Sequence, residues 1–156
     1  MSIDTETKVE RRIVFKLSDE HYAVDIRRVK EIIKVLPITR VPKSVSYLEG
    51  VINLRGRVVP VLDLRKRFNL PELEGVSKRF LVVEHKGALM GLIVDGVDEV
   101  LEFTDDMVLP PPLLSQTFNK EFLEGIVKRD EDIVILLSIE KLLDREIERL
   151  KTNAGG

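Results

Sequence analysis

The chain has 156 residues, of which 44% are hydrophobic, 33% are charged and 5% are aromatic, and its net charge is −2. This length suits one domain, or two small lobes sharing a core, and the near-neutral charge gives no electrostatic case for binding nucleic acid. The chain has no cysteine, which excludes disulfide frameworks and thiolate metal sites.

The N-terminal segment MSIDTETKVE is polar and acidic and has no apolar core of the kind found in signal peptides. We therefore expect residues 1–10 to form a disordered tail. No apolar run approaches the length of a transmembrane helix, so a cytoplasmic location is expected. Residues 1–75 carry a net charge of +4 and residues 76–156 a net charge of −6. This contrast is either drift in surface charge or a sign of two different partners.

Short strands separated by turns are predicted in the first third of the chain. Apolar and β-branched residues indicate a hairpin made of Arg12–Leu17 and Tyr22–Ile26. Residues 27–33 are ambiguous between a helical turn and a strand, and we favour a brief turn that runs into a strand through about Val35 and stops before Pro37.

A second hairpin is predicted within LEGVINLRGRVVPVLDLRKRF, residues 48–68. Two apolar runs, Val51–Leu54 and Val58–Leu62, flank the polar turn Arg55-Gly56-Arg57. A short helix over Leu64–Phe68 follows the hairpin. The polar residues 71–77 then form the predicted crossover to a second lobe.

The second half of the chain repeats this alternation of strands and turns. Strands are predicted over Arg79–Glu84, Ala88–Val94 and Val97–Phe103. Residues 104–118 contain three consecutive prolines and indicate a surface loop. An amphipathic helix is predicted over Ile139–Leu150, and residues 151–156 are expected to be a flexible tail.

The second hairpin and its helix recur 75 residues later without a gap, as LEGIVKRDEDIVILLSIEKLL at residues 123–143. Gly50 falls on Gly125, and we interpret both as left-handed residues that close a helical turn. Asp63 falls on Ser138, and both residues can cap a helix N-terminus. A weaker match pairs residues 24–32 with residues 94–100. The duplication predicts a mainly β protein of two small five-stranded barrels packed side by side, with lobes over residues 11–75 and 76–150.

No catalytic or metal site is indicated by the polar residues. The sequence has no G-x-S-x-G motif, P-loop or G-x-G-x-x-G motif. His21 and His85 are expected to be solvated residues of hairpin turns. The acidic residues between Asp95 and Asp106 do not have the spacing of a calcium loop and are interpreted as a solvated face. No cofactor is therefore expected.

Two features indicate contact with another protein. Arg55 sits on a stiff turn, from which its guanidinium could bind a carboxylate or carbonyl of a partner, although composition alone favours a solvated turn arginine. Val29 and Ile32 lie among basic residues, as in an interface with an apolar centre and a charged rim. Core residues of an edge strand would give the same pattern.

Four segments together resemble the bacterial chemotaxis coupling proteins of the CheW family. They are YAVDIRRVKEI, YLEGVINLRGRVVPVLDLRKRF, MGLIVDGVDEVL and LEGIVKRDEDIVILLSIEKLL. The resemblance runs from about residue 12 to residue 147. It implies two five-stranded SH3-like β-barrels, short helices and a C-terminal amphipathic helix. It also implies a non-enzymatic adaptor that couples the cytoplasmic tips of transmembrane chemoreceptors to the histidine kinase CheA.

The resemblance further implies a groove between the barrels that holds the helical receptor tip. By position, the groove residues would be Val29, Glu31, Gly50, Arg55 and Val100. The regulatory domain of CheA would pack end-on against the barrels, through residues that the sequence does not identify.

Two alternatives remain open. The first is a CheW-like regulatory module cut from a larger kinase or receiver-containing protein, which the short length disfavours. The second is a small β-barrel enzyme or ligand carrier that uses the acidic face between Asp95 and Asp106.

Overall fold

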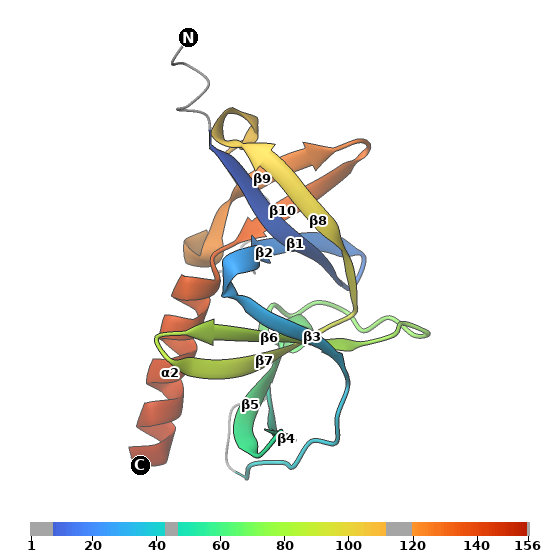
Figure 1. Ribbon diagram of the computed structural model, residues 1–156. Coiled ribbons are helices and arrows are strands. Elements are labelled where there is room, and N and C mark those ends of the chain that lie inside the picture. The colour runs from blue at the N-terminus through green and yellow to red at the C-terminus, as the bar shows by residue number, and fades with distance from the viewer. Residues whose placement is uncertain (1–7, 43–46, 112–119, 156) are drawn as a thin grey trace.

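The computed structural model of the protein describes residues 8–42, 47–111 and 120–155. Its strands form two five-stranded sheets, which lie one above the other in Figure 1. Sheet A contains β1 (Val9–Leu17), β2 (Glu20–Asp25), β8 (Gly96–Thr104), β9 (Leu123–Arg129) and β10 (Asp132–Leu137). Sheet B contains β3 (Val29–Lys34), β4 (Leu48–Leu54), β5 (Arg57–Asp63), β6 (Arg79–His85) and β7 (Ala88–Val94). The helical elements are η2 (Ile26–Arg28), α1 (Leu64–Arg67), η3 (Asp105–Met107), η4 (Lys120–Phe122) and α2 (Ile139–Gly155).

The predicted duplication is visible in the order of the strands. Sheet A has the order β8-β1-β2-β10-β9, and sheet B has the order β3-β6-β7-β5-β4. The two orders correspond position by position when each strand is matched with the strand five places away in the chain. The predicted repeat of hairpin and helix is therefore β4, β5 and α1 in the first copy and β9, β10 and α2 in the second. The strands of the first copy lie in sheet B, and those of the second lie in sheet A.

The predicted lobes of residues 11–75 and 76–150 are wrong, because strands are exchanged between the two copies. Sheet B is built from the continuous segment of residues 29–94, whereas sheet A combines the hairpin β1-β2 with three strands that follow residue 95. Local patterns identify which segments are equivalent. They do not reveal whether a strand pairs within its own copy, because that depends on contacts far apart in the sequence.

Each sheet curls, but continuous strand pairing does not close it into a barrel. In sheet B the gap is spanned by two backbone hydrogen bonds of 2.8 Å between Thr39 and Val51 of β4. In sheet A, Leu109 and Ile126 of β9 exchange two hydrogen bonds of 2.9 Å. The structure thus confirms the mainly β class with two five-stranded units and a C-terminal helix, and it shows that the barrels are only partly closed.

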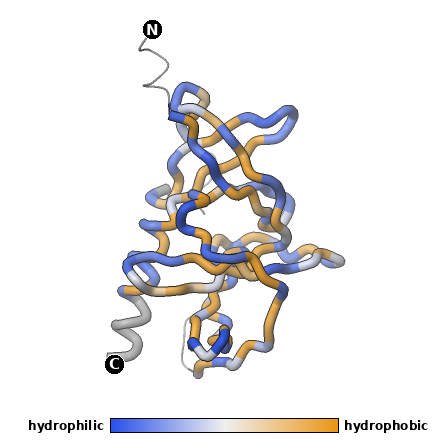
Figure 2. The backbone as a smooth tube through the Cα atoms, viewed as in Figure 1, coloured by the Kyte–Doolittle hydropathy of each residue, from blue (hydrophilic) through white to orange (hydrophobic). Residues whose placement is uncertain are grey.

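Three apolar clusters form the interior. The largest, the inter-sheet core, joins residues of both sheets with residues of both α-helices, including Phe15, Tyr22, Leu81, Leu92 and Leu142. Smaller clusters fill the inside of sheet A, around Val14, and of sheet B, around Val82. Figure 2 shows apolar segments along the strands, and central strands such as β6 and β7 are buried on both faces because they lie between the inter-sheet core and the interior of sheet B.

The helix α2 leaves sheet A and packs beside sheet B, as Figure 1 shows. Ile139, Leu142 and Leu143 are buried in the inter-sheet core, as the helical spacing predicts. The helix reaches Gly155, so the tail expected at residues 151–156 is helical through residue 155, and residue 156 lies outside the described part. The N-terminal tail is also shorter than expected, since β1 begins at Val9, and residues 1–7 lie outside the described part.

The exchange of strands predicts a single unfolding transition. Val14 and Val82 are fully buried in the separate interiors of sheets A and B. Changing either one to alanine should remove roughly 2 kcal/mol from the free energy of unfolding. Because each sheet holds the other in place, both variants should shift one common transition, measured by circular dichroism during heating. Two separate transitions, or a shift of only part of the melting curve, would contradict this prediction.

A candidate protein-interaction site between the sheets

The edge strand β3 places two apolar residues beside the inter-sheet core. Val29 lies opposite Val83 of β6, and Ile32 lies opposite Leu81. Residues that oppose each other in an antiparallel pair point to the same face of the sheet. Since Val83 and Leu81 belong to the inter-sheet core, Val29 and Ile32 lie on that side of β3. Val29 is half-buried, whereas Ile32 is 42% exposed.

In sheet A, the edge strand β8 likewise places two apolar residues beside the inter-sheet core. Val97 lies opposite Phe15 of β1, and Val100 lies opposite Ile13. Phe15 and Ile13 are inter-sheet core residues, against which Val97 packs, while Val100 is 45% exposed. We call Val29, Ile32, Val97 and Val100 the inter-sheet strip. It is the solvent-facing margin of the core that joins the two sheets.

Both halves of the strip contain the same irregularity. The register of β3 shifts between Val29 and Glu31, and the register of β1 with β8 shifts between Ile13 and Phe15. Each shift leaves one extra residue on the edge strand, which is a β-bulge. In a regular strand, residues three positions apart point to opposite faces. The extra residue of each bulge places Val29 and Ile32, and likewise Val97 and Val100, on the same face.

Arg55 lies on the turn between β4 and β5, as predicted. Arg55 has φ = +50° and Gly56 has φ = +86°, the backbone of a two-residue hairpin turn. The turn is fixed by Asn53, whose side-chain oxygen accepts a hydrogen bond of 2.8 Å from the Gly56 N–H. The Arg55 side chain is 69% exposed and donates a hydrogen bond to the Glu31 carboxylate of β3. This ion pair spans the open side of sheet B.

An equivalent contact in sheet A involves Arg129, at the end of β9. Its guanidinium lies 3.2 Å from the Asp98 carboxylate and 3.6 Å from the Glu99 carboxylate, both in the bulge of β8. Arg129 is mostly buried, with 15% of its side chain exposed. In both sheets, therefore, an arginine of a hairpin is paired with an acidic residue of the exchanged edge strand.

Gly50 has a structural role that differs from the predicted one. It lies inside β4 at a bulge rather than at the end of a helical turn. Its φ is +146°, and a Cβ atom there would lie 2.1 Å from the Thr39 carbonyl oxygen. Gly125 in β9 has the same role, since a Cβ there would lie 2.8 Å from the Leu109 oxygen. Glycine is needed at both positions so that the chain can cross the gap in each sheet.

The five predicted groove residues thus fall into three groups. Val29 and Val100 belong to the inter-sheet strip. Glu31 and Arg55 contact each other at the edge of sheet B. Gly50 is buried and supports the closure of that sheet.

Some residues of this region were not among the predicted groove residues. The sequence places Ile32 in an apolar segment but not in the groove, and it assigns no partner-binding role to Val97 or Arg129. The weaker internal match contains the signal for the first two, because it aligns Val29 and Ile32 with Val97 and Val100. The pairing of Arg129 depends on how β9 meets β8 and has no local signal.

The acidic residues between Asp95 and Asp106 do not converge on one point. Asp95 is buried and accepts a hydrogen bond of 2.7 Å from the Ser18 N–H. Asp98 pairs with Arg129, and Glu102 lies 3.7 Å from Arg11. Among the described residues, no group of three or more acidic or histidine side chains could hold a metal ion.

His85 is not a solvated turn residue, contrary to the prediction. It is the last residue of β6 and only 6% exposed, and its Nε2 lies 2.7 Å from Asp144 of α2. Lys86 and His85 together lower the pKa of Asp144. His21 lies within β2 rather than in the turn before it. Asp144 comes from a helix 59 residues away, which explains why the sequence did not reveal the burial of His85.

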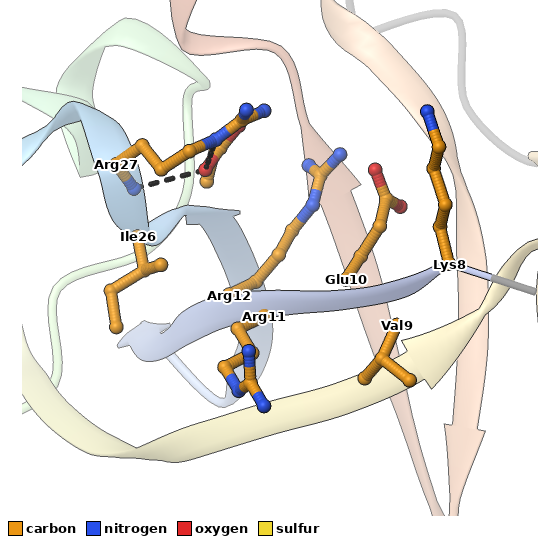
Figure 3. Close-up of a pocket in the computed structure, with 8 residues that line it drawn as sticks. Lys8, Val9, Glu10, Arg11, Arg12, Ile26 and Arg27 are labelled. Atoms are coloured by element: carbon orange, nitrogen blue, oxygen red, sulfur yellow. Dashed lines mark hydrogen bonds and ion pairs between the residues drawn. The ribbon is translucent and has the colours of Figure 1, made fainter. Parts of the chain in front are cut away.

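A hollow of about 400 Å³ beside β1 is lined by residues 8–12 and 25–27. Figure 3 shows that Lys8, Glu10 and Arg12 project to one side of β1, while Val9 and Arg11 project to the other. The two best-placed guanidinium groups already have partners in the protein. Arg27 holds the Asp25 carboxylate at 2.7 Å and lowers its pKa, and Arg12 holds Glu124 at 2.7 Å. We therefore assign no ligand to this hollow.

The architecture and the inter-sheet strip indicate a class of protein. Two intertwined β-sheets present an exposed apolar strip with charged neighbours, which is the composition of a protein-binding surface. None of the helices in residues 8–42, 47–111 and 120–155 is long and apolar enough to span a membrane. The fold and the site are those of an adaptor or scaffold domain.

The chain belongs to the CheW-like domain family, whose family profile matches residues 11–146. It is 35% identical to the chemotaxis protein CheW of Klebsiella aerogenes over 96% of this chain and 91% of that protein. It is 36% identical to the chemotaxis protein CheW of Bacillus subtilis over 88% of each chain. The crystal structure of the scaffolding protein TtCheW from Thermoanaerobacter tengcongensis matches with a TM-score of 0.78 and 38% identity, over 86% of this chain and 88% of that chain.

Proposed function

We propose that this protein is a non-enzymatic chemotaxis adaptor that couples the cytoplasmic tips of transmembrane chemoreceptors to the histidine kinase CheA. It would act in the cytoplasm, recruited to receptor arrays at the membrane. Membership of the CheW-like domain family carries this proposal, and the inter-sheet strip supports it with a surface suited to a helical partner. No cofactor takes part in this function.

The receptor tip would bind along the inter-sheet strip. Exposed apolar side chains of Ile32 and Val100 supply burial, and Val29 supports them from the core. Arg55 and Glu31 lie beside the strip on sheet B and would make polar contacts that fix the position of the helix. Gly50 would act indirectly, by keeping β4 in place.

The CheA regulatory domain would bind a different surface, end-on to one of the sheets. A titration of ¹⁵N-labelled protein with a receptor-tip fragment and then with this domain tests both contacts. Amide shifts clustered on β3 and β8 with the first ligand, and elsewhere with the second, are expected. The absence of shifts with both ligands would reject the proposed function.

Replacing Arg55 with alanine should weaken binding of the receptor fragment about tenfold, the size of effect seen for a single important interface residue. The thermal stability should barely change, because exposed ion pairs contribute less than about 1 kcal/mol. Calorimetric titration and thermal unfolding measure the two effects.

Arg57 provides the matched control for this experiment. It is an exposed arginine two residues away on the same hairpin, so Arg57→Ala removes the same charge. Binding should be nearly unchanged in this variant. A large drop in the Tm of Arg55→Ala would show instead that the pair with Glu31 holds sheet B together.

A further inference from the structure

The inter-sheet strip has two nearly equivalent sides. Its β3 side carries Val29 and Ile32, and its β8 side carries Val97 and Val100 at matching positions around matching bulges. Both strands lie on the near face of the molecule in Figure 1. An approximate two-fold axis between these sides exchanges them. A helix lying on the strip would be reversed by the same rotation, so apolar contact alone does not select one direction for the helix.

The charged residues beside the strip break this equivalence. Lys30 and Lys34 of β3 occupy the positions that Asp98 and Glu102 occupy in β8, and all four are exposed. Along its whole length, β3 carries two lysines and one glutamate, a net charge of +1. The strand β8 carries one aspartate and two glutamates, a net charge of −3.

Neighbouring strands reduce this contrast but do not remove it. On the β3 side, Glu84 lies 3.2 Å from Lys30, and Arg79 lies opposite Lys34. Because the pair of Glu31 with Arg55 is neutral, the remaining charges of this side sum to +2. On the β8 side, Arg11 and Arg129 offset two of the three acidic charges and leave −1. The pairs of Lys30 with Glu84 and of Arg11 with Glu102 are exposed and therefore weak, so their charged groups remain available to a partner.

We propose that this charge difference fixes the direction in which a helix binds along the strip. The partner is an amphipathic helix with an apolar ridge, acidic residues on the flank that faces β3 and basic residues on the flank that faces β8. Turning the helix around places like charges together on both sides, which opposes binding. The inference rests on the proposed function, because it concerns the same surface and its helical partner.

A designed helical peptide with a leucine ridge, a glutamate flank and a lysine flank tests the direction of binding. A nitroxide label at its N-terminus broadens the NMR signals of nearby amides in the full-length protein. Lys34 and Glu102 lie toward opposite ends of the strip, because each stands near the C-terminal end of its strand and β3 and β8 run in opposite directions in Figure 1. Loss of signal at only one of these ends is expected.

The double variant Lys34→Glu/Glu102→Lys exchanges the charges without altering the net charge of the protein. The loss of signal should move to the opposite end of the strip. The control variant Lys16→Glu/Glu131→Lys makes the same exchange at exposed positions outside the strip and should leave the pattern unchanged.

The outcomes separate this inference from the proposed function. Broadening at both ends, or at the same end in the wild type and the Lys34/Glu102 variant, would overturn the directional role of the charges while the strip still binds a helix. The absence of shifts with both the peptide and the receptor-tip fragment would overturn both proposals.

Discussion

Replacing Gly50 with alanine is expected to destabilise the protein by about 4 kcal/mol, a large effect for a single substitution. The added Cβ atom would lie 2.1 Å from the Thr39 oxygen and 2.8 Å from the Thr39 carbonyl carbon. Both are backbone atoms, so a change of side-chain rotamer cannot relieve the clash. The hydrogen bonds between Thr39 and Val51 that span the gap in sheet B would be lost. Thermal unfolding should show a decrease in Tm of roughly 10 °C.

Gly56→Ala is the matched control for this prediction. Gly56 also has a positive φ, of +86°, but a Cβ atom there would meet no atom within 4 Å. Its substitution should cost only the backbone strain, about 1 kcal/mol. If the two variants unfold at the same temperature, the Thr39 segment moves aside easily, and Gly50 is not required for the closure of sheet B.

Replacing Arg67 with alanine is expected to cost about 3–5 kcal/mol, because it leaves a buried carboxylate without its charged partner. Arg67 ends α1, and its Nε lies 2.8 Å from the Glu146 carboxylate of α2, with 8% and 2% of the two side chains exposed. The guanidinium also lies over the rings of Tyr47 and Phe122, at 5.1 Å and 5.3 Å from their centroids. Urea unfolding measures the loss of stability.

A double variant separates the buried charge from the lost packing. Arg67→Met/Glu146→Met removes both charges and keeps apolar volume between the two helices, so it should be more stable than Arg67→Ala alone. A single Arg67→Ala variant that loses less than about 1 kcal/mol would show that the Glu146 carboxylate reaches water when its partner is absent.

Much of the local structure could be predicted from the sequence, because hairpins and short helices depend on neighbouring residues. The turn at Arg55 and the helix that begins at Ile139 lie where the patterns indicate, whereas the segment before β3 was ambiguous between a helical turn and a strand and proves to be the short 3-10 helix η2. Sheet membership could not be predicted in this way. The chain crosses from sheet A to sheet B after Asp25, and it returns at Asp95, and neither crossing leaves a compositional signal.

The apolar part of the candidate site was predictable because its residues occur at equivalent positions in both copies of the internal repeat. The duplication aligns Val29 with Val97 and Ile32 with Val100. The two residues of β3 in the strip therefore indicate the two equivalent residues of β8. Arg55 and Glu31 are both predicted groove residues, but their contact with each other was not predictable because it depends on the curl of sheet B. Gly50 illustrates another limit. A glycine kept in both copies indicates a backbone requirement, but a positive φ and a close approach to another segment give the same signal.

The division of the chain between the sheets has a consequence for synthesis on the ribosome. Sheet B is encoded without interruption, so it can assemble once residue 94 has emerged. The hairpin β1-β2 is made first but must wait for β8 and for β10, which ends at Leu137, before both of its edges are covered. Among the described strands, β1 and β2 are thus the earliest to be translated and yet must wait for β8 and β10 before both are paired. During that interval we expect the charged side chains of Arg11, Arg12 and Lys16 to disfavour pairing of the open hairpin with other nascent chains, because charges on an edge strand oppose edge-to-edge pairing.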